Sequence, residues 1–401
     1  MSSVVQAPAT VPGAKGHTDG AGAFVPVQTR SERPHSFDPA DFGAPAGFEV
    51  NWKHTPIARL SAVFTDEETE AGPDLAIAYD LAAIDDYVVE STGHEAAVRG
   101  EFFRPDDLSS AIAWKRSQNA LHVRIPADTE PADALTLGIV GRGAERHANA
   151  HIILEALPNS KATVVLAHSG SAAYAQNVEI IVRDGAQLTV VTVQRWDEDA
   201  VHVSSHQARV DRDARLRHIV VSFGGGVVRV NPSVELAGAG SEAELYGLSY
   251  ADAGQHLESQ VYLFHKGPET RGDVLYKGAL QGVGARSVWI GDVQIGPDAV
   301  GTDSYEANRN LVLTDGARAE SIPNLEIQTG DIRGAGHASA TGRFDDEQLF
   351  YLQARGISEE EARRLVVIGF LSEIVQRIGI PALEAELSEA IEAELKEGTA
   401  Q

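Results

Sequence analysis

The middle of the chain carries short runs of alternating apolar and polar residues, which begin at about Leu135 and continue for nearly two hundred residues. The runs are rich in β-branched residues and are bounded by turn residues, as in KATVVLA, NVEIIVR, QLTVVTVQR and QVYLFH. Such alternation is typical of β-strands, whose successive side chains point to opposite faces. Helical periodicity is absent throughout. The pattern therefore predicts that residues 135–343 form a mainly β domain.

The turns between these runs repeat along the chain. RDGAQLTVV, DRDARLRHIVV, GSEAELYGL and TDGARAESI each place an acidic or glycine turn before an alanine and a new alternating run. The alanines at positions 186, 214 and 243 are 28 and 29 residues apart, and Ala162 precedes the first of them by 24. A period of this length indicates the coils of a β-solenoid, in which each coil buries its apolar side chains against the next. A large β-sandwich is the alternative.

The segments before and after this domain show other patterns. Residues 1–47 are rich in Ala, Pro, Gly, Thr and Ser, which predicts a disordered arm. Residues 48–134 indicate a mixed α/β region, with strands at 86–89 and 120–125 and a helix at 105–117.

Residues 344–401 predict a helical region. Ser358 and Glu361 have the spacing of a capping box, and two amphipathic helices are expected at 359–378 and 382–396. We expect these helices either to cap the end of the solenoid or to present a docking face to a partner.

A segment of Gly, Ala and Ser, Gly334–Gly342, separates the β domain from the helical region and contains one histidine, His337. Small residues allow close approach of another backbone. We therefore expect a loop here that joins the two regions, with His337 as its candidate functional group.

Composition narrows the range of functions. The 401-residue chain has 58 acidic and 33 basic side chains, and its formal net charge of −25 disfavours binding to nucleic acid or to an anionic membrane. No apolar run approaches the roughly 20 residues that span a bilayer, and no signal-peptide pattern is evident, so we expect a cytoplasmic protein. Cysteine is absent, which excludes disulfides, a thiolate nucleophile and a Cys-ligated cluster built from this chain alone.

Histidine spacing gives only a weak indication of a metal site. His202 and His206 would share one face of a strand, and His147 and His151 would do likewise. Metal sites generally need three or four ligands, so we expect these histidines to be packed or at the surface.

The remaining motifs do not point to catalysis. The glycine clusters Gly224–Gly226 and Gly282–Ala285 lack the Lys and Ser/Thr of a phosphate-binding loop and are expected to be solenoid turns. No catalytic motif is evident, so no catalytic residue is predicted. Acidic residues on the predicted turns leave a carbohydrate-active β-helix enzyme as an alternative.

Three phrases in the C-terminal third, NLVLTDGARAESIPNLEI, HASATGRFDDEQLFYLQARGI and EEARRLVVIGF, resemble the C-terminal signature of the SufB/SufD family of iron–sulfur cluster assembly proteins. EVNWKHTPIARL, at residues 49–60, resembles the entry to the SufD branch. The resemblance extends from about residue 48 to about residue 378. It implies a right-handed parallel β-helix core in a subunit, not itself an enzyme, that pairs with a SufB-like subunit and binds a SufC-like ATPase. A homodimeric solenoid with a structural role is a further alternative.

The resemblance also implies site residues. His337 aligns with a family histidine, whereas the cysteine that often precedes that histidine is missing here. His337 is therefore the candidate ligand for iron or a transient iron–sulfur cluster at the interface with a SufB-like partner, and no cofactor is expected to bind stably to this chain alone. The candidate partner-binding residues, in the region expected to dock the ATPase, are Phe350, Leu365, Ile368, Phe370, Leu371 and Ile374.

Overall fold

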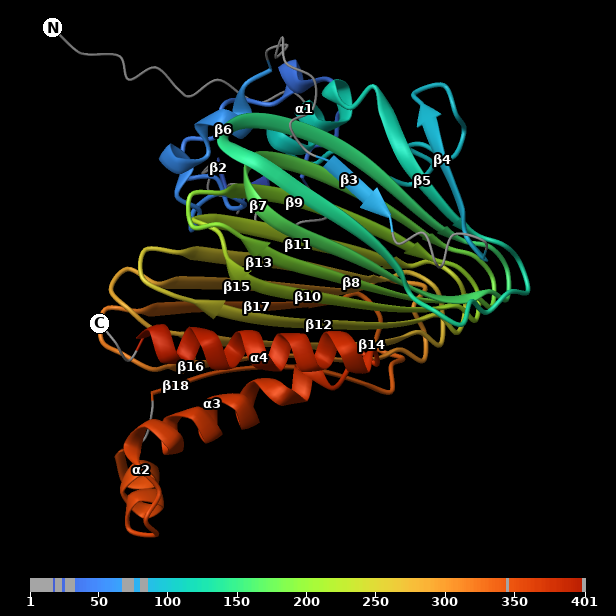
Figure 1. Cartoon of the computed structure of the whole chain (residues 1–401). Helices are drawn as coiled ribbons and strands as arrows, with labels where there is room; N and C mark the ends of the chain where they lie inside the picture. Colours follow the sequence, from blue (N-terminus) through green and yellow to red (C-terminus); the bar gives the residue numbers. More distant parts are fainter. Residues whose placement is uncertain are drawn as a thin grey trace, which may run out of the picture.

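The structure, a computed structural model, describes residues 17–18, 24–25, 33–66, 76–79, 86–343 and 346–398. It is mainly parallel β-sheet wound into a solenoid of about eight turns. Figure 1 shows the strands stacked side by side along the solenoid. The predicted β-solenoid is confirmed, and the sandwich alternative is wrong because neighbouring strands of the stack are parallel.

The solenoid has two faces, which we name after their first ten-residue strands. The β8 face consists of β8 (Gln187–Trp196), β10 (Arg215–Gly224), β12 (Glu242–Ala251), β14 (Arg271–Leu280), β16 (Asp303–Val312) and β18 (Gly334–Arg343). The β9 face consists of β9 (Val201–Val210), β11 (Val227–Leu236), β13 (His256–His265), β15 (Arg286–Ile295) and β17 (Arg318–Ile327). The longer strands β6 (Leu135–Ala156) and β7 (Lys161–Val182) run through both faces. Residues 161–170 of β7 pair with β8, and residues 173–182 pair with β9.

The turns that lead from the β9 face to the β8 face share one backbone feature. In every such turn except the last, between β17 and β18, the residue two positions before the next strand has a positive φ: Asn159, Gly185, Asp213, Gly240, Glu269 and Gly301. The backbone N–H of this residue donates to the neighbouring turn, for example from Gly185 to the carbonyl of Arg212 at 2.9 Å. Glycine, Asn and Asp tolerate this left-handed conformation best, which explains why the sequence repeats acidic and glycine turns.

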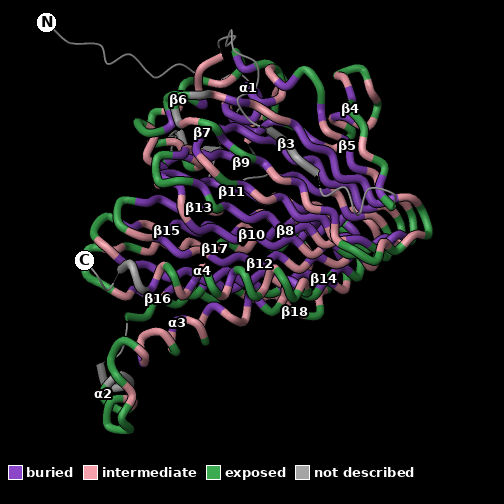
Figure 2. The backbone as a smooth tube through the Cα atoms, in the orientation of Figure 1, coloured by how far each residue is buried: buried purple, intermediate pink, exposed green. Residues whose placement is uncertain are grey.

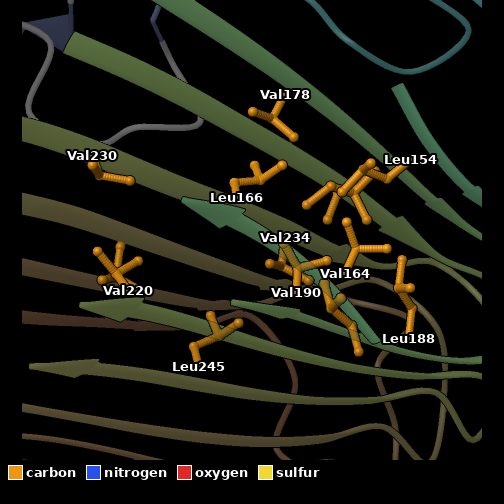
Figure 3. Close-up of a cluster of buried hydrophobic side chains, with 14 of the residues drawn as sticks. Leu154, Val164, Leu166, Val178, Leu188, Val190, Val220, Val230, Val234 and Leu245 are labelled. Atoms are coloured by element: carbon orange, nitrogen blue, oxygen red, sulfur yellow. The ribbon is translucent and has the colours of Figure 1, made fainter. Parts of the chain in front are cut away.

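The space between the two faces, which we call the lumen, is the main hydrophobic core (Figure 3). Inward side chains such as Val190 and Leu245 from the β8 face meet Val230 and Val234 from the β9 face. The four alanines of the sequence repeat are all buried in this core: Ala162, Ala186, Ala214 and Ala243. Stacking of equivalent positions in successive coils therefore produced the sequence period.

Two of the C-terminal helices, α3 (Glu359–Val375) and α4 (Pro381–Gly398), cover the outer side of the β8 face. The third, α2 (Asp346–Gln353), packs on α3 and lies furthest from the solenoid (Figure 1). The backbone N–H of Glu361 donates to the Ser358 hydroxyl, which caps α3 as predicted, while the Glu361 carboxylate binds Arg364. The helices therefore lie across a sheet face and not at the end of the solenoid.

The N-terminal region covers the outer side of the β9 face. Its helix α1 (Leu108–Arg116) is capped by Asp107, and it follows the short 3-10 helices η2 (Pro39–Asp41), η3 (Ile57–Arg59) and η4 (Ser61–Phe64). Trp52, Leu60 and Val63 pack against outward side chains of the β9 face such as Val203. The helix predicted at 105–117 corresponds to α1.

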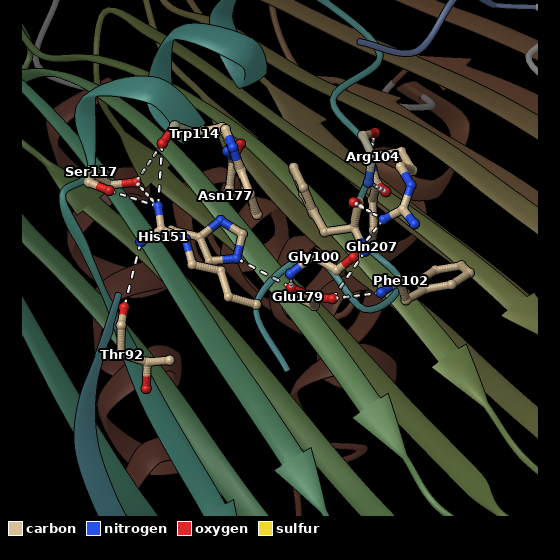
Figure 4. Close-up of polar contacts among 12 residues, drawn as sticks. Thr92, Gly100, Phe102, Arg104, Trp114, Ser117, His151, Asn177, Glu179 and Gln207 are labelled. Atoms are coloured by element: carbon tan, nitrogen blue, oxygen red, sulfur yellow. Dashed lines mark hydrogen bonds and ion pairs between the residues drawn. The ribbon is translucent and has the colours of Figure 1, made fainter. Parts of the chain in front are cut away.

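Polar contacts also fix this region to the sheet (Figure 4). Glu179 of β7 accepts hydrogen bonds from the backbone N–H groups of Gly100, Phe102 and Phe103 at 2.7–3.0 Å and lies 3.3 Å from the ring of His151. Burial raises the pKa of the Glu179 carboxyl, but these hydrogen bonds outweigh burial and hold the pKa below its usual range.

The first coil is extended by strands from the N-terminal region. β5 (Asn119–Ile125) pairs with β6 in parallel, β4 (Val88–Gly93) pairs with β5, and β3 (Ala76–Tyr79) pairs with β6. The predicted strands at 86–89 and 120–125 correspond to β4 and β5. A separate antiparallel pair is formed by β1 (His17–Thr18) and β2 (Phe24–Val25).

Two segments differ from the rest in how they compare with the sequence-based expectations. The segment Gly334–Gly342, expected to be a loop, is instead most of β18, which continues the register of β16 residue by residue. Small side chains are compatible with an edge strand, and β18 ends at the predicted boundary of the β domain, residue 343. Most of the expected disordered arm, 1–47, lies outside the described residues. Arg33, within that range, lies 3.9 Å from Asp106 with its side chain 11% exposed.

Every helix in the described parts of the chain is too short or too polar to span a bilayer.

Candidate functional site

The last coil of the solenoid, formed by β17 and β18, is the end of the strand order, and no described strand stacks on it. Residues from His337 to Arg343 are exposed, and most of β17 is only partly buried. Figure 2 shows the contrast with the buried strands of the central coils. An open strand edge presents backbone N–H and C=O groups that can pair with another chain. We call this surface, β17 and β18, the open end.

His337 lies on β18 at the mouth of the lumen. Its neighbour two positions earlier, Ala335, packs on the lumen core, so His337 faces the same way. The side chain is 44% exposed, and its Nδ1 lies 3.8 Å from Oε1 of Glu306. The imidazole is therefore accessible from the open end and can act as a ligand.

Glu306, the residue paired with His337 in the β16–β18 register, is a buried acid that sequence reasoning missed. Its side chain is fully buried, and neither carboxylate oxygen has a hydrogen-bond partner among the described residues. Burial, together with the negative charge of Asp292, raises the pKa of Glu306 to about 8. Only the coil period could have revealed this residue, because it lies one coil, 31 positions, before His337.

The candidate partner-binding residues divide into two groups. Leu371 and Ile374 are fully buried against outward side chains of the β8 face, and Ile368 and Phe370 pack partly on the same cluster. The apolar stripe of α3 is therefore largely covered by the solenoid itself.

Phe350 and Leu365, in contrast, are 71% and 44% exposed. Tyr351, next to Phe350 in the sequence, is also exposed, although sequence reasoning did not single it out. We call these three exposed residues the apolar surface of α2 and α3, two helices that contact each other. Exposed large apolar side chains are a common mark of a docking site.

The predicted histidine pair His202 and His206 faces the lumen and is buried. Trp196 Nε1 donates to Nδ1 of His202 at 3.2 Å, and Nδ1 of His206 lies 2.9 Å from Nε2 of His218. Burial lowers the pKa of His218 to about 4 and lowers those of His202 and His206 well below the usual range. These imidazoles are neutral packing groups of the interior at neutral pH.

The second predicted pair, His147 and His151, lies on β6, where His151 is buried beside Glu179. Within the described residues, no set of three or more His, Cys, Asp or Glu side chains is arranged to hold a metal ion. The glycine clusters lie in solenoid turns, as predicted: Gly225 follows β10, and Gly282 and Gly284 lie between β14 and β15.

These features define a class of protein: a parallel β-solenoid with an open last coil and helices packed on one face. A family model described as SUF system FeS cluster assembly, SufBD core domain, matches residues 139–370. The chain belongs to this SufBD family of iron–sulfur cluster assembly proteins.

Similar proteins carry the same description. A protein of Mycobacterium bovis described as an iron–sulfur cluster assembly SufBD family protein is 45% identical over 367 residues, which cover 90% of this chain and 92% of that protein. A Mycobacterium leprae protein so described is 44% identical over 366 residues, 90% of this chain and 93% of that protein. A second M. leprae protein so described is 28% identical over 219 residues, 55% of this chain and 25% of that protein. One organism thus contains two family members, and this chain is much more similar to one of them.

Proposed function

We propose that this chain is a SufD-like subunit of a SufBCD-type scaffold, which pairs through its open end with a SufB-like subunit. The observation that carries the proposal is the open end itself: two ten-residue strands of the last coil, one of them bearing His337, stack on no further described strand. A solenoid coil buries its inward side chains by stacking, so a second solenoid supplies the missing neighbour. The absence of cysteine fits a subunit whose partner contributes the thiolates.

The substrate of the proposed site is iron or a nascent iron–sulfur cluster held transiently between the two subunits. A neutral imidazole is an adequate iron ligand alongside thiolates. His337 is the group that this chain offers, and the chain itself performs no catalytic step and binds no cofactor stably in this proposal. We place the complex in the cytoplasm, without nucleic acid or membrane partners.

The helical region, residues 344–401, is proposed to bind a SufC-like ATPase. Support comes from the exposed apolar surface formed by Phe350, Tyr351 and Leu365, and from the position of α2 away from the solenoid (Figure 1). In this proposal the ATPase and the SufB-like subunit bind to different residues of the chain.

Co-purification from the native host tests the proposal. A tagged chain should recover a SufB-like and a SufC-like protein in near-equal amounts, identified by mass spectrometry. Recovery of the chain alone, as a monomer or homodimer, would overturn the proposal in favour of the structural solenoid. A carbohydrate-active enzyme, which family membership disfavours, would instead cleave polysaccharides without any partner.

Replacing the imidazole tests the site within the complex. His337→Ala should leave complex formation intact, because the half-exposed side chain supports no core. It should lower the affinity of the reconstituted complex for iron by at least about tenfold, measured by anaerobic reconstitution with iron and sulfide assays. Wild-type iron content in the variant would return His337 to a purely structural role, and a complex that fails to form would make His337 an interface residue.

A further inference from the structure

The column of inward side chains that ends at His337 contains a carboxyl group one coil earlier. Along the β8 face, successive coils place His218, Leu245, Val274, Glu306 and His337 in register. Leu245 and Val274 are buried apolar residues of the lumen core, and the ring of His218 contacts His206. An acid follows Val274 where the stack would accept another apolar side chain. The packing of the chain alone therefore does not explain a carboxyl group at this position.

The environment of Glu306 supplies no compensation for its burial. Both carboxylate oxygens lack hydrogen-bond partners among the described residues, although the side chain is fully buried. Burying a polar group without such partners is costly. Across the lumen, β15 has Gly291, where a Cβ atom would overlap Oε2 of Glu306. The glycine leaves room for the acid, and the acid faces the mouth of the lumen where His337 lies.

Other buried acids beside histidines in this chain are different, because each has a further partner. Glu179 accepts backbone hydrogen bonds beside His151, and Glu258 binds Arg229 beside His256. Glu155 binds Arg183 beside His122, and Glu320 binds Arg286 beside His54. In each of these pairs the buried carboxylate already has a second hydrogen-bond or ion-pair partner besides the histidine. Among the described histidine–glutamate contacts with a buried carboxylate, the contact between Glu306 and His337 is the incomplete one.

We propose that Glu306 and His337 form a two-ligand half-site for a divalent transition-metal ion such as Fe²⁺, with Glu306 as the second protein ligand. Two ligands with bonds of about 2.1 Å to one tetrahedral ion are about 3.4 Å apart, close to the 3.8 Å between Nδ1 and Oε1. Imidazole and carboxylate together suit ferrous iron and similar ions. The other coordination positions face the open end, where water or a partner's ligands complete the site. This inference rests on the proposed function for its physiological ion, whereas the half-site itself belongs to this chain.

The half-site can be tested on the isolated full-length chain, without an affinity tag and with Co²⁺ as the probe. Isotope labelling of histidine makes the imidazole C–H signals visible by NMR, and His337→Ala identifies the signal of His337. Paramagnetic Co²⁺ should shift and broaden this signal before those of the other histidines. Glu306→Gln should raise the dissociation constant at His337 at least about tenfold, the loss expected when one of two protein ligands is removed.

The matched control is Glu326→Gln, which removes a carboxylate from the same open end. Glu326 lies on β17 and accepts a hydrogen bond from Gln328, so its replacement should leave Co²⁺ binding at His337 unchanged. Glu306→Ala is a second variant that removes both oxygens, and thermal denaturation establishes that each variant is folded.

Three outcomes would overturn the inference. One is Co²⁺ binding to wild-type protein without an effect at His337. Another is unaltered binding in both Glu306 variants, which would leave His337 as a single ligand. The third is an equal loss in the Glu326 variant, which would indicate only general attraction of cations to an acidic protein. Co-purification tests the proposed function independently of Co²⁺ binding. Glu306→Gln should still co-purify with the SufB-like partner if the proposed function is correct.

Discussion

The two ends of the solenoid differ in how far their strand edges are covered by other parts of the chain. At the first coil, β5 stacks on β6, and β4 and β3 add further pairing, so the edge is largely covered. At the last coil, β17 and β18 end the strand order, and His337 lies exposed at the mouth of the lumen. Both ends have the same coil geometry, but only the first coil is stabilised by further strands, and the last coil is the end that we propose for association.

The largest effect is expected where a charge is placed in the covered part of the stack. Ile152 of β6 is fully buried in the lumen core, and Ile152→Asp should destabilise the folded chain by more than about 4 kcal/mol, because it buries an unpaired carboxyl and loses apolar contact. Chemical denaturation measures this loss. A folded variant of near wild-type stability would mean that the first coils are not closely packed.

Acid should weaken the interior through its buried histidines. The folded-state pKa of His168 and of His218 is about 4, below the ordinary value near 6.5 of an unfolded chain. The unfolded state therefore binds more protons as the pH falls from 6.5 toward 4, and stability falls over that window. Each of these two imidazoles should cost about 1 kcal/mol between pH 7 and pH 5.5.

Denaturation curves at the two pH values measure this dependence. His218→Gln should flatten it, because the variant lacks one of the two buried imidazoles. An unaltered slope in the His218 variant would contradict the expectation.

At the open end, a charge should affect association more than folding. Ile327 at the end of β17 is 44% exposed, so Ile327→Asp should change stability by less than about 0.5 kcal/mol. Binding to the SufB-like partner should weaken at least about tenfold, because an interface core tolerates an unpaired charge poorly. Pull-down and calorimetry with the purified partner check this, and unchanged affinity would place the interface elsewhere.

The helical surface should respond independently of either end. Phe350→Asp, alone or with Leu365→Asp, should weaken binding of the SufC-like ATPase about tenfold while the SufB-like partner still binds. Ile327→Asp is the matched control, since it should leave ATPase binding intact. If both variants lose both partners, the two surfaces are not separate.

The solenoid could be predicted from the sequence because each coil repeats the same turn and the same inward positions. The placement of the C-terminal helices could not, since an apolar stripe shows that a helix is buried and does not show against what. One signal was available: runs such as QLTVVTV are apolar on both faces, with Val190 in the lumen and Val191 under the helices. Strands that are buried on both faces have such nearly continuous apolar sequences.

The candidate site was only partly accessible from the sequence. His337 was noted as the one histidine of a Gly/Ala/Ser segment and received its ligand role from a family resemblance, but its position at an open strand edge required the structure. Leu371 and Ile374 were chosen as apolar residues of a helix, but the same property places them against the sheet. Glu306 carried no local mark, because the chain has 58 acidic residues and only the β16–β18 register sets this one beside His337.

The stacking of coils determines which part of the protein should unfold locally first. Each coil is held mainly by its two neighbours, so local unfolding free energies should be highest in the middle coils and lowest where a neighbour is missing. Strand β18 pairs only with β16, and its amide protons should therefore exchange with solvent much faster than those of β12. A chain that docks on this strand would slow that exchange, and the fraying coil would become as protected as the interior.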